Sequence, residues 1–195
     1  MTSTSLAPAL LFSMPQLLDP NFKRTVILLC KHSDDGAFGL VLNRPLITSG
    51  RVVLNLDPLE GEGLGPSTSE MVKEDLEVWV GGPVEPERSW ILVHGTPDGM
   101  HDFGVRVAEG VSLSTSPDLL QRLLAPNPPR DARLMVGYSG WGPGQLEAEL
   151  RESAWLIGEV DCDLMFNTPP DRMWETAIRR LGADPATLQM SRGVH

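Results

Sequence analysis

The clearest hydrophobic pattern is a continuous apolar run at residues 25–30, T-V-I-L-L-C, which follows the turn-like segment Asp19-Pro20-Asn21. Its length and its β-branched residues predict a buried strand. Turn residues ending in Gly36 and a second apolar run at 37–43 come next, so the two runs predict a β-hairpin in which Gly36 adopts a positive φ. Gly39, inside the second run, indicates a bulge or a close approach of two backbones.

The pattern weakens in the middle of the chain. Residues 47–75 contain four glycines, two prolines and the run S-T-S, with little periodicity. We therefore expect a Gly/Pro-rich excursion without regular structure at 47–75, within a single domain that spans residues 1–195. A loop of that length in a compact domain is often functional or disordered.

The second half alternates between the two kinds of element. A helix is predicted to start at Pro117, because Ser116 supplies an N-cap and proline suits the first helical position. Further helices are predicted at 144–153 and at 170–181, the latter ended by Gly182. Apolar runs predict strands at 77–80, 89–94, 105–107, 111–114, 133–138, 154–158 and 163–166. A hairpin followed by this alternation predicts an α+β fold with a mixed sheet.

Composition narrows the functional classes. The chain has 195 residues, of which 41% are hydrophobic, and this is enough for one soluble domain with a substantial core. Cys30 and Cys162 are far apart and form no zinc or redox motif, so we expect a reducing, cytoplasmic location. No apolar run is long enough to span a membrane. The net charge of -10 opposes binding to nucleic acid.

The most distinctive segment is G-Y-S-G-W-G-P-G-Q-L at residues 137–146, between a predicted strand and a predicted helix. A G-x-S-x-G nucleophile elbow fails to match by one residue, because Trp141 stands where glycine is required. Gly140, Gly142 and Gly144 suit a phosphate-binding turn, but no lysine follows and acidic residues do. Two further interpretations are favoured over these: a turn beside a buried indole, bonded by Gln145, or a recognition surface built around Trp141.

Other reactive side chains form weaker patterns. The histidines have no metal-binding spacing, although His101 next to Asp102 is a candidate base. Asp161 and Asp163 would share one face of an extended strand and are candidates for a divalent ion, but no third ligand lies nearby. We expect no metal and no cofactor. Cys30, inside an apolar run, is interpreted as a small buried hydrophobe.

Four ordered motifs and a following tryptophan resemble one family. They are F-S-M-P-Q-L-L-D-P-N-F-K-R-T-V at 12–26, G-A-F-G-L-V-L-N-R-P-L at 36–46, V-G-G-P-V at 80–84, G-Y-S-G-W-G-P-G-Q-L-E-A-E-L at 137–150, and Trp155. In this order they resemble the bacterial YqgE/AlgH family over nearly the whole chain. The resemblance implies an α+β domain with a mixed, bifurcated β-sheet curled into a pseudo-barrel and helices packed outside. Members are mostly uncharacterised, and their label of transcriptional regulator descends from a genetic link to alginate control.

Two departures from the family matter. Ser139 stands where many members have alanine, which argues against a serine nucleophile. The excursion at 47–75 replaces a short amphipathic helix, which puts any partner surface on that helix in doubt.

The sequence favours a non-catalytic regulatory or protein-interaction protein. The resemblance and the turn together suggest a binding surface for a protein partner, composed of Asp19, Asn21, Asn43, Gly82, Pro83, Gly140, Trp141, Gly142, Gly144 and Gln145. The short polar residues of this set also suit hydrogen bonds that fix turns. The alternative is a small-molecule-binding protein or enzyme with its pocket at the 140–145 turn, using backbone N–H groups and His101 or Asp163. A DNA-binding regulator ranks last.

Overall fold

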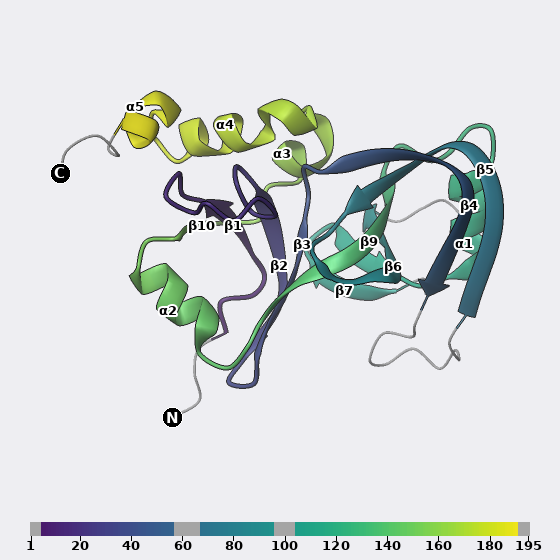
Figure 1. Cartoon of the computed structure of the whole chain (residues 1–195), viewed down its shortest axis with the longest axis horizontal. Helices are drawn as coiled ribbons and strands as arrows, with labels where there is room; N and C mark the ends of the chain where they lie inside the picture. The colour runs from purple at the N-terminus through teal and green to yellow at the C-terminus, as the bar shows by residue number, and fades with distance from the viewer. Residues whose placement is uncertain (1–4, 57–66, 96–103, 191–195) are drawn as a thin grey trace. The chain divides into compact units, whose positions relative to one another are not determined.

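The computed structural model describes residues 5–56, 67–95 and 104–190. It forms two compact units, one from Met1–Arg44 with Ser139–His195 and the other from Pro45–Tyr138. Figure 1 traces the elements of both. No helix in the described part of the chain combines the length and the apolar character needed to cross a membrane.

The first unit is built on an antiparallel sheet in the order β10-β1-β2-β3-β9, of which only the end of β9 belongs to this unit. Its strands are β1 (Ala9–Ser13), β2 (Val26–Ser33), β3 (Gly36–Val41), β9 (Ala132–Trp141) and β10 (Trp155–Gly158). Its helices are α2 (Gln145–Arg151), α3 (Cys162–Asn167), α4 (Pro170–Arg180) and α5 (Pro185–Met190). Neither β1 nor α5 is among the elements that the sequence pattern predicts.

The predicted β2–β3 hairpin is confirmed. Gly36 has φ 131°, as the tight turn requires. Gly39 marks a close approach, because a Cβ there would lie 2.8 Å from Cγ2 of Ile27 and 2.9 Å from the carbonyl oxygen of Leu28. The hairpin register also shifts between Leu29 and Lys31.

Two layers of helix cover this sheet. Leu146 of α2 packs on one face, in a cluster with Leu11, Ile27, Trp141 and Trp155. Since side chains alternate along a strand, the neighbours of Leu11 and Ile27 point to the opposite face, where α4 contacts β1 and β2. Figure 1 shows α2 and α4 on opposite sides of these strands.

The second unit closes its strands into a ring. It contains β4 (Pro45–Leu56), β5 (Ser67–Val80), β6 (Val84–His94), β7 (Val105–Ala108), β8 (Val111–Ser114), α1 (Pro117–Leu124) and most of β9. The pairings run β9-β5-β4-β6, and β6 pairs back with β9. Two of these pairings, β4 with β6 and β5 with β9, are parallel and the others antiparallel, so the sheet is mixed. Because β9 pairs in both units, the sheet is bifurcated, and the α+β pseudo-barrel expected from the resemblance is confirmed.

The expectation of an irregular excursion at 47–75 is wrong wherever the structure describes it. Residues up to Leu56 belong to β4 and those from Ser67 belong to β5, and the two strands pair antiparallel from Leu56↔Ser67 to Pro45↔Trp79. Backbone hydrogen bonds between strands do not depend on side-chain periodicity, so a strand pair can form where the alternation is weak. Residues 57–66 lie outside the described part.

The predicted strand at 163–166 is also wrong. Residues Cys162–Asn167 form α3, because Asp161 caps the helix by accepting a hydrogen bond from the backbone N–H of Leu164 at 3.0 Å. The other predicted helix signals are confirmed. Ser116 caps α1 by accepting from the N–H of Leu119, and Gly182, with φ 80°, follows the end of α4.

Candidate functional site

The 140–145 turn links the end of β9 to α2. Gly140, Gly142, Gly144 and Gln145 are exposed, whereas the Trp141 side chain is buried, with 6% of the residue accessible. The Gln145 side chain closes the turn, because its Oε1 accepts a hydrogen bond from the N–H of Gly142 at 3.0 Å. The interpretation of this segment as a turn beside a buried indole therefore matches the geometry. Direct contact between a partner and Trp141 is opposed by its burial.

Glu149 fixes the turn through hydrogen bonds to three side chains. Its Oε2 accepts hydrogen bonds from the indole N–H groups of Trp141 at 2.9 Å and of Trp155 at 2.7 Å. Its Oε1 accepts from the side-chain amide of Gln145 at 2.9 Å. The rings of Trp141 and Trp155 also meet edge to face, with centroids 6.0 Å apart. One carboxylate thus joins the turn, α2 and β10.

Sequence reasoning missed Glu149. The sequence feature that could have indicated its role is the spacing of four residues between Gln145 and Glu149, which puts both side chains on one helix face. Nothing local identifies the two indoles as its partners, since they come from different strands.

The geometry also opposes the nucleophile-elbow and phosphate-binding interpretations of the motif. Ser139 lies inside β9, opposite Gly39, and is fully buried, so it is not presented at an elbow. The N–H of Gly142 is already bonded to Gln145, and the N-cap residue of α2, Gly144, has no side chain to cap the helix. A phosphate cradle would need those N–H groups to be available.

The predicted residues Asp19, Asn21 and Asn43 lie elsewhere in the first unit. Trp141 pairs with Ala37 near the start of β3, whereas Asn43 lies beyond its end, roughly 20 Å away at strand spacing. Asn43 is buried and fixes the start of β2, accepting from the N–H of Val26 at 3.1 Å and donating to the carbonyl of Arg24 at 2.9 Å. The carboxylate of Asp19 accepts from the backbone and side-chain N–H groups of Asn21. Their observed bonds are turn-fixing.

Gly82 and Pro83 belong to the second unit, between β5 and β6, where Gly82 is buried and Pro83 is exposed. The ten predicted residues therefore do not form one continuous site within the first unit. Of the ten, the five residues of the 140–145 turn lie next to one another.

His32 makes a contact that the sequence did not suggest. Its Nδ1 accepts a hydrogen bond from the N–H of Leu6 at 3.1 Å, so its Nε2 carries the proton and donates to Oε1 of Glu147 at 2.9 Å. The pKa of Glu147 is held below its ordinary value, first by its own backbone N–H and then by His32. Both ring nitrogens of His32 are thus used to attach the N-terminal segment and α2 to β2.

Asp161 and Asp163 do come together, but around a cation of the protein. The guanidinium of Arg180 donates to Oδ2 of Asp161 at 2.5 Å and to Oδ2 of Asp163 at 2.6 Å. The pKa of Asp163 is lowered, chiefly by this hydrogen bond and then by Asn167. In the part of the chain that the structure describes, no group of three or more His, Cys, Asp or Glu side chains suits a metal ion. His101 and Asp102 lie outside the described residues.

A cavity lies in the second unit and contains none of the predicted residues. It has a volume of about 410 Å³ and lies between β5, β9 and the segment after α1. Arg133 and Trp79 line it, with the guanidinium carbon 4.1 Å from the ring centroid. The pocket expected at the 140–145 turn is not this one.

Comparison with known proteins identifies the family. A family model described as AlgH-like matches residues 10–186. The chain belongs to the AlgH-like family. A UPF0301 protein of Myxococcus xanthus is 39% identical over 98% of this chain and 99% of its own length. Another, of Anaeromyxobacter dehalogenans, is 40% identical over 96% of this chain and 94% of its own.

Solved structures agree with this assignment. The solution structure of the AlgH protein from Pseudomonas aeruginosa is 32% identical, with a TM-score of 0.62, covering 100% of this chain and 98% of that one. A crystal structure from Corynebacterium diphtheriae, 18% identical, has a TM-score of 0.63 over 96% of this chain and 91% of that one, and it supports the fold alone. The names of these AlgH-like relatives state no activity.

Proposed function

We propose that this AlgH-like protein is a non-catalytic, cytosolic interaction protein that binds a basic segment of a protein partner through one end of its first unit. We call this end the acidic tip. It consists of Asp34 and Asp35 in the β2–β3 turn, the 140–145 turn, and Glu147. The observation that carries the proposal is an exposed turn held in place by hydrogen bonds that the partly buried Glu149 accepts from the buried Trp141 and Trp155.

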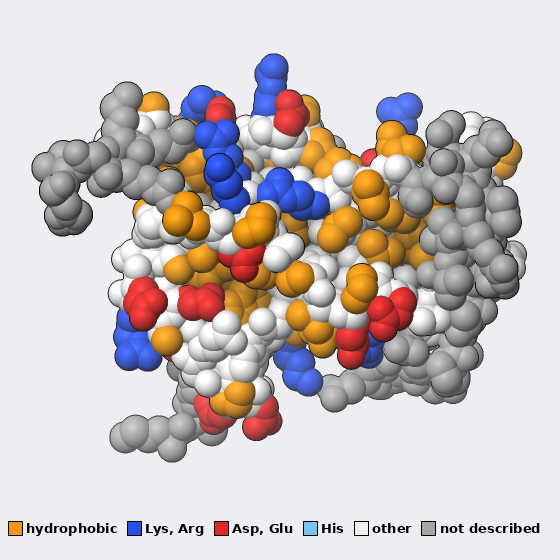
Figure 2. All heavy atoms as spheres, viewed as in Figure 1, with side chains coloured by type: hydrophobic (Ala, Val, Ile, Leu, Met, Phe, Trp, Pro, Cys, Tyr) orange, Lys and Arg blue, Asp and Glu red, His pale blue; other side chains and the backbone are white. Residues whose placement is uncertain are grey.

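The two turns of the acidic tip are adjacent. Ala37 pairs with Trp141, and a Cβ on Gly36 would collide with the carbonyl oxygen of Trp141. Asp34 and Asp35 are exposed, and Glu147 is partly exposed. Figure 2 has acidic side chains at the lower end of the view, where Figure 1 has the β2–β3 hairpin. Such a surface attracts cationic side chains.

The rigid backing favours binding. A surface that is already ordered loses less conformational entropy when a partner docks, so more of the interaction energy appears as affinity. Here the backbone of the turn is fixed by Gln145, and Gln145 is in turn fixed by Glu149.

Further observations support the other parts of the proposal. The buried Ser139 and the fully engaged His32 favour a non-catalytic role for this unit. Cys30 and Cys162 are both free thiols, as in proteins of reducing compartments. The net charge of -10 favours a basic protein over nucleic acid.

The test is a quantitative affinity capture from a lysate of the host bacterium at physiological ionic strength. The bait variant is Asp34→Asn/Asp35→Asn, because asparagine keeps the turn chemistry and removes two charges. The matched control is Asp171→Asn/Glu175→Gln, which removes two charges from α4 of the same unit. A protein partner captured by the wild type and the control, but at least about tenfold less by the tip variant, is expected.

Two results would overturn the proposal. One is equal recovery of every protein partner by all three baits. The other is capture dominated by DNA with a steep loss of binding as salt rises, which would favour the DNA-binding alternative instead.

A further inference from the structure

The cavity of the second unit lies where two strands diverge. β5 and β9 run parallel, and their register pairs Trp79 with Met135 and Val80 with Val136. Residues 76–77 of β5 and 132–134 of β9 line the cavity instead of continuing this ladder. The opening is therefore a feature of the strand arrangement, and its volume of about 410 Å³ is within the usual range of small-molecule sites.

One wall of the cavity is apolar. Leu123, at the end of α1, and Pro128 and Pro129 in the segment that follows keep part of their surface exposed. Leu76 and Leu134 also line the cavity and belong to the buried core against which Leu123 packs. Such a wall takes up a hydrocarbon chain or a ring, since burying apolar surface is favourable without directional contacts.

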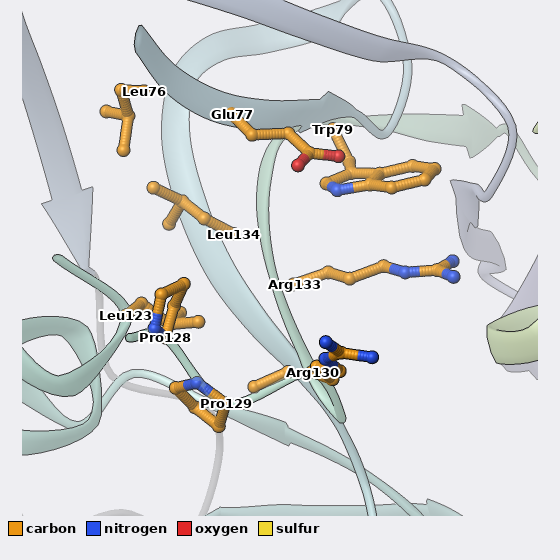
Figure 3. A pocket seen from close by; sticks show the side chains of 10 residues that line it. Leu76, Glu77, Trp79, Leu123, Pro128, Pro129, Arg130, Arg133 and Leu134 are labelled. Atoms are coloured by element: carbon orange, nitrogen blue, oxygen red, sulfur yellow. The ribbon is translucent and has the colours of Figure 1, made fainter. Parts of the chain in front are cut away.

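The other wall is basic and aromatic. The guanidinium of Arg133 lies over the indole of Trp79, and Arg130 and Glu77 also line the cavity (Figure 3). Burial lowers the pKa of Arg133 to about 10, and Glu77 opposes that shift. Arg133 therefore remains cationic at neutral pH.

The stacked geometry prepares Arg133 to bind an anion. An Arg side chain held flat on an aromatic ring loses less rotamer freedom when it forms a bond, and its planar fork matches the two oxygens of a carboxylate. The apolar surroundings strengthen such a bond because less water competes for it.

The charges limit the ligand. The lining carries two arginines and one glutamate, hence a net charge of +1, in a chain whose net charge is -10. A single negative charge is matched by this lining, whereas a second would be repelled by Glu77 and by the field of the whole chain.

We propose that this cavity binds a small organic monocarboxylate, whose carboxylate meets Arg133 and whose apolar body lies on Pro128 and Pro129. This site is separate from the acidic tip, and its test does not depend on the proposed function.

The test follows the indole N–H signals of the full-length protein in proton–nitrogen correlated NMR spectra. The chain has five tryptophans, and Trp79→Phe identifies the signal of Trp79 by its loss. The probes are benzoate and hexanoate, with benzamide and hexanamide as neutral analogues of the same shape and inorganic phosphate as an anion without an apolar body.

A saturable shift of the Trp79 signal is expected with at least one of the two carboxylates. The neutral amides and phosphate should bind at least about tenfold more weakly, because they lack the charge or the apolar body. Arg133→Met, which keeps the aliphatic stem, should weaken carboxylate binding by a similar factor. Arg106→Met, an exposed arginine on β7, is the matched control and should leave it unchanged.

Three results would overturn the proposal: no shift of the Trp79 signal with either carboxylate, equal affinity for carboxylate and amide, or unchanged affinity in Arg133→Met. If Arg133→Met loses the native spectrum, carboxylate binding is measured instead in the variants Arg133→Lys and Leu123→Trp. The first keeps a cation without the planar fork and the second fills the cavity, so binding that survives both unchanged rejects the site.

Discussion

Trp141 and Trp155 donate their indole N–H groups to the same atom, Oε2 of Glu149. Both rings are buried, and neither strand that carries them contains the acceptor. A carboxylate oxygen with two lone pairs can accept both bonds, whereas an apolar side chain would leave two buried donors without partners. One glutamate of α2 therefore bonds this helix to both β9 and β10, in addition to the packing of Leu146.

Glu149→Ala should lower the free energy of unfolding by about 2–4 kcal/mol, because two bonds to a charged acceptor are lost together. The measurement is urea unfolding followed by tryptophan fluorescence. Glu152→Ala, an exposed glutamate at the end of α2, is the control and should change the free energy by at most about 0.5 kcal/mol. Similar losses in both variants would contradict the role assigned to Glu149.

Alanine substitutions at two glycines should differ in their effect on stability, because Gly39 is closely packed and Gly142 lies in the exposed turn. Gly39→Ala should destabilise the protein by about 1–3 kcal/mol, because its Cβ would lie 2.8 Å from Cγ2 of Ile27. Gly142→Ala should be tolerated, since the nearest atom to its Cβ is Oε1 of Gln145 at 3.9 Å. Thermal unfolding of both variants checks this, and equal melting temperatures would refute the close approach at Gly39.

The bond between His32 and Glu147 should contribute a stability that depends on pH. The pKa of Glu147 is lower in the folded protein than its ordinary value of 4.5, so its contribution is complete above that value and is lost as the pH falls through the folded value. The difference in unfolding free energy between wild type and Glu147→Gln should be at most about 1 kcal/mol at neutral pH, since the side chain is partly exposed, and it should shrink in acid. Urea unfolding at a series of pH values measures it. A difference that does not change with pH would rule the effect out.

Cys30 should react slowly with thiol reagents in the native protein. Burial raises the pKa of its thiol, which also donates a hydrogen bond to the carbonyl of Leu28 at 3.5 Å, so little thiolate forms at neutral pH. In a Cys162→Ser variant, which leaves Cys30 as the only thiol, labelling should become fast only after addition of denaturant. Fast labelling of the native variant would show that the thiol is accessible and ionised.

Local sequence determined the elements whose signals are contained within a few residues. The turn at Gly36, the cap of Ser116 and the stop at Gly182 each follow from the dihedral preference or hydrogen bond of one residue, and each is confirmed. The motifs also sufficed to indicate the family and its fold, since the order of short segments along a chain is itself sequence information.

Prediction from local sequence was wrong where an element is stabilised by a strand that lies far away in the sequence. The strands β4 and β5 form through pairing with each other and with β9, so their weak periodicity was misleading. Residues 162–167 became helix because the side chain of Asp161 caps them, a signal that the apolar run obscured.

What the sequence determined by itself was the set of turns, caps and apolar runs, and through them the family. The tertiary structure alone decided which polar groups meet: Glu149 with two indoles, His32 with Glu147, and Arg133 with Trp79 beside a cavity. The physical reason is that a buried polar group must find a partner wherever the fold brings one, and that partner is set by strand order and helix packing rather than by spacing along the chain.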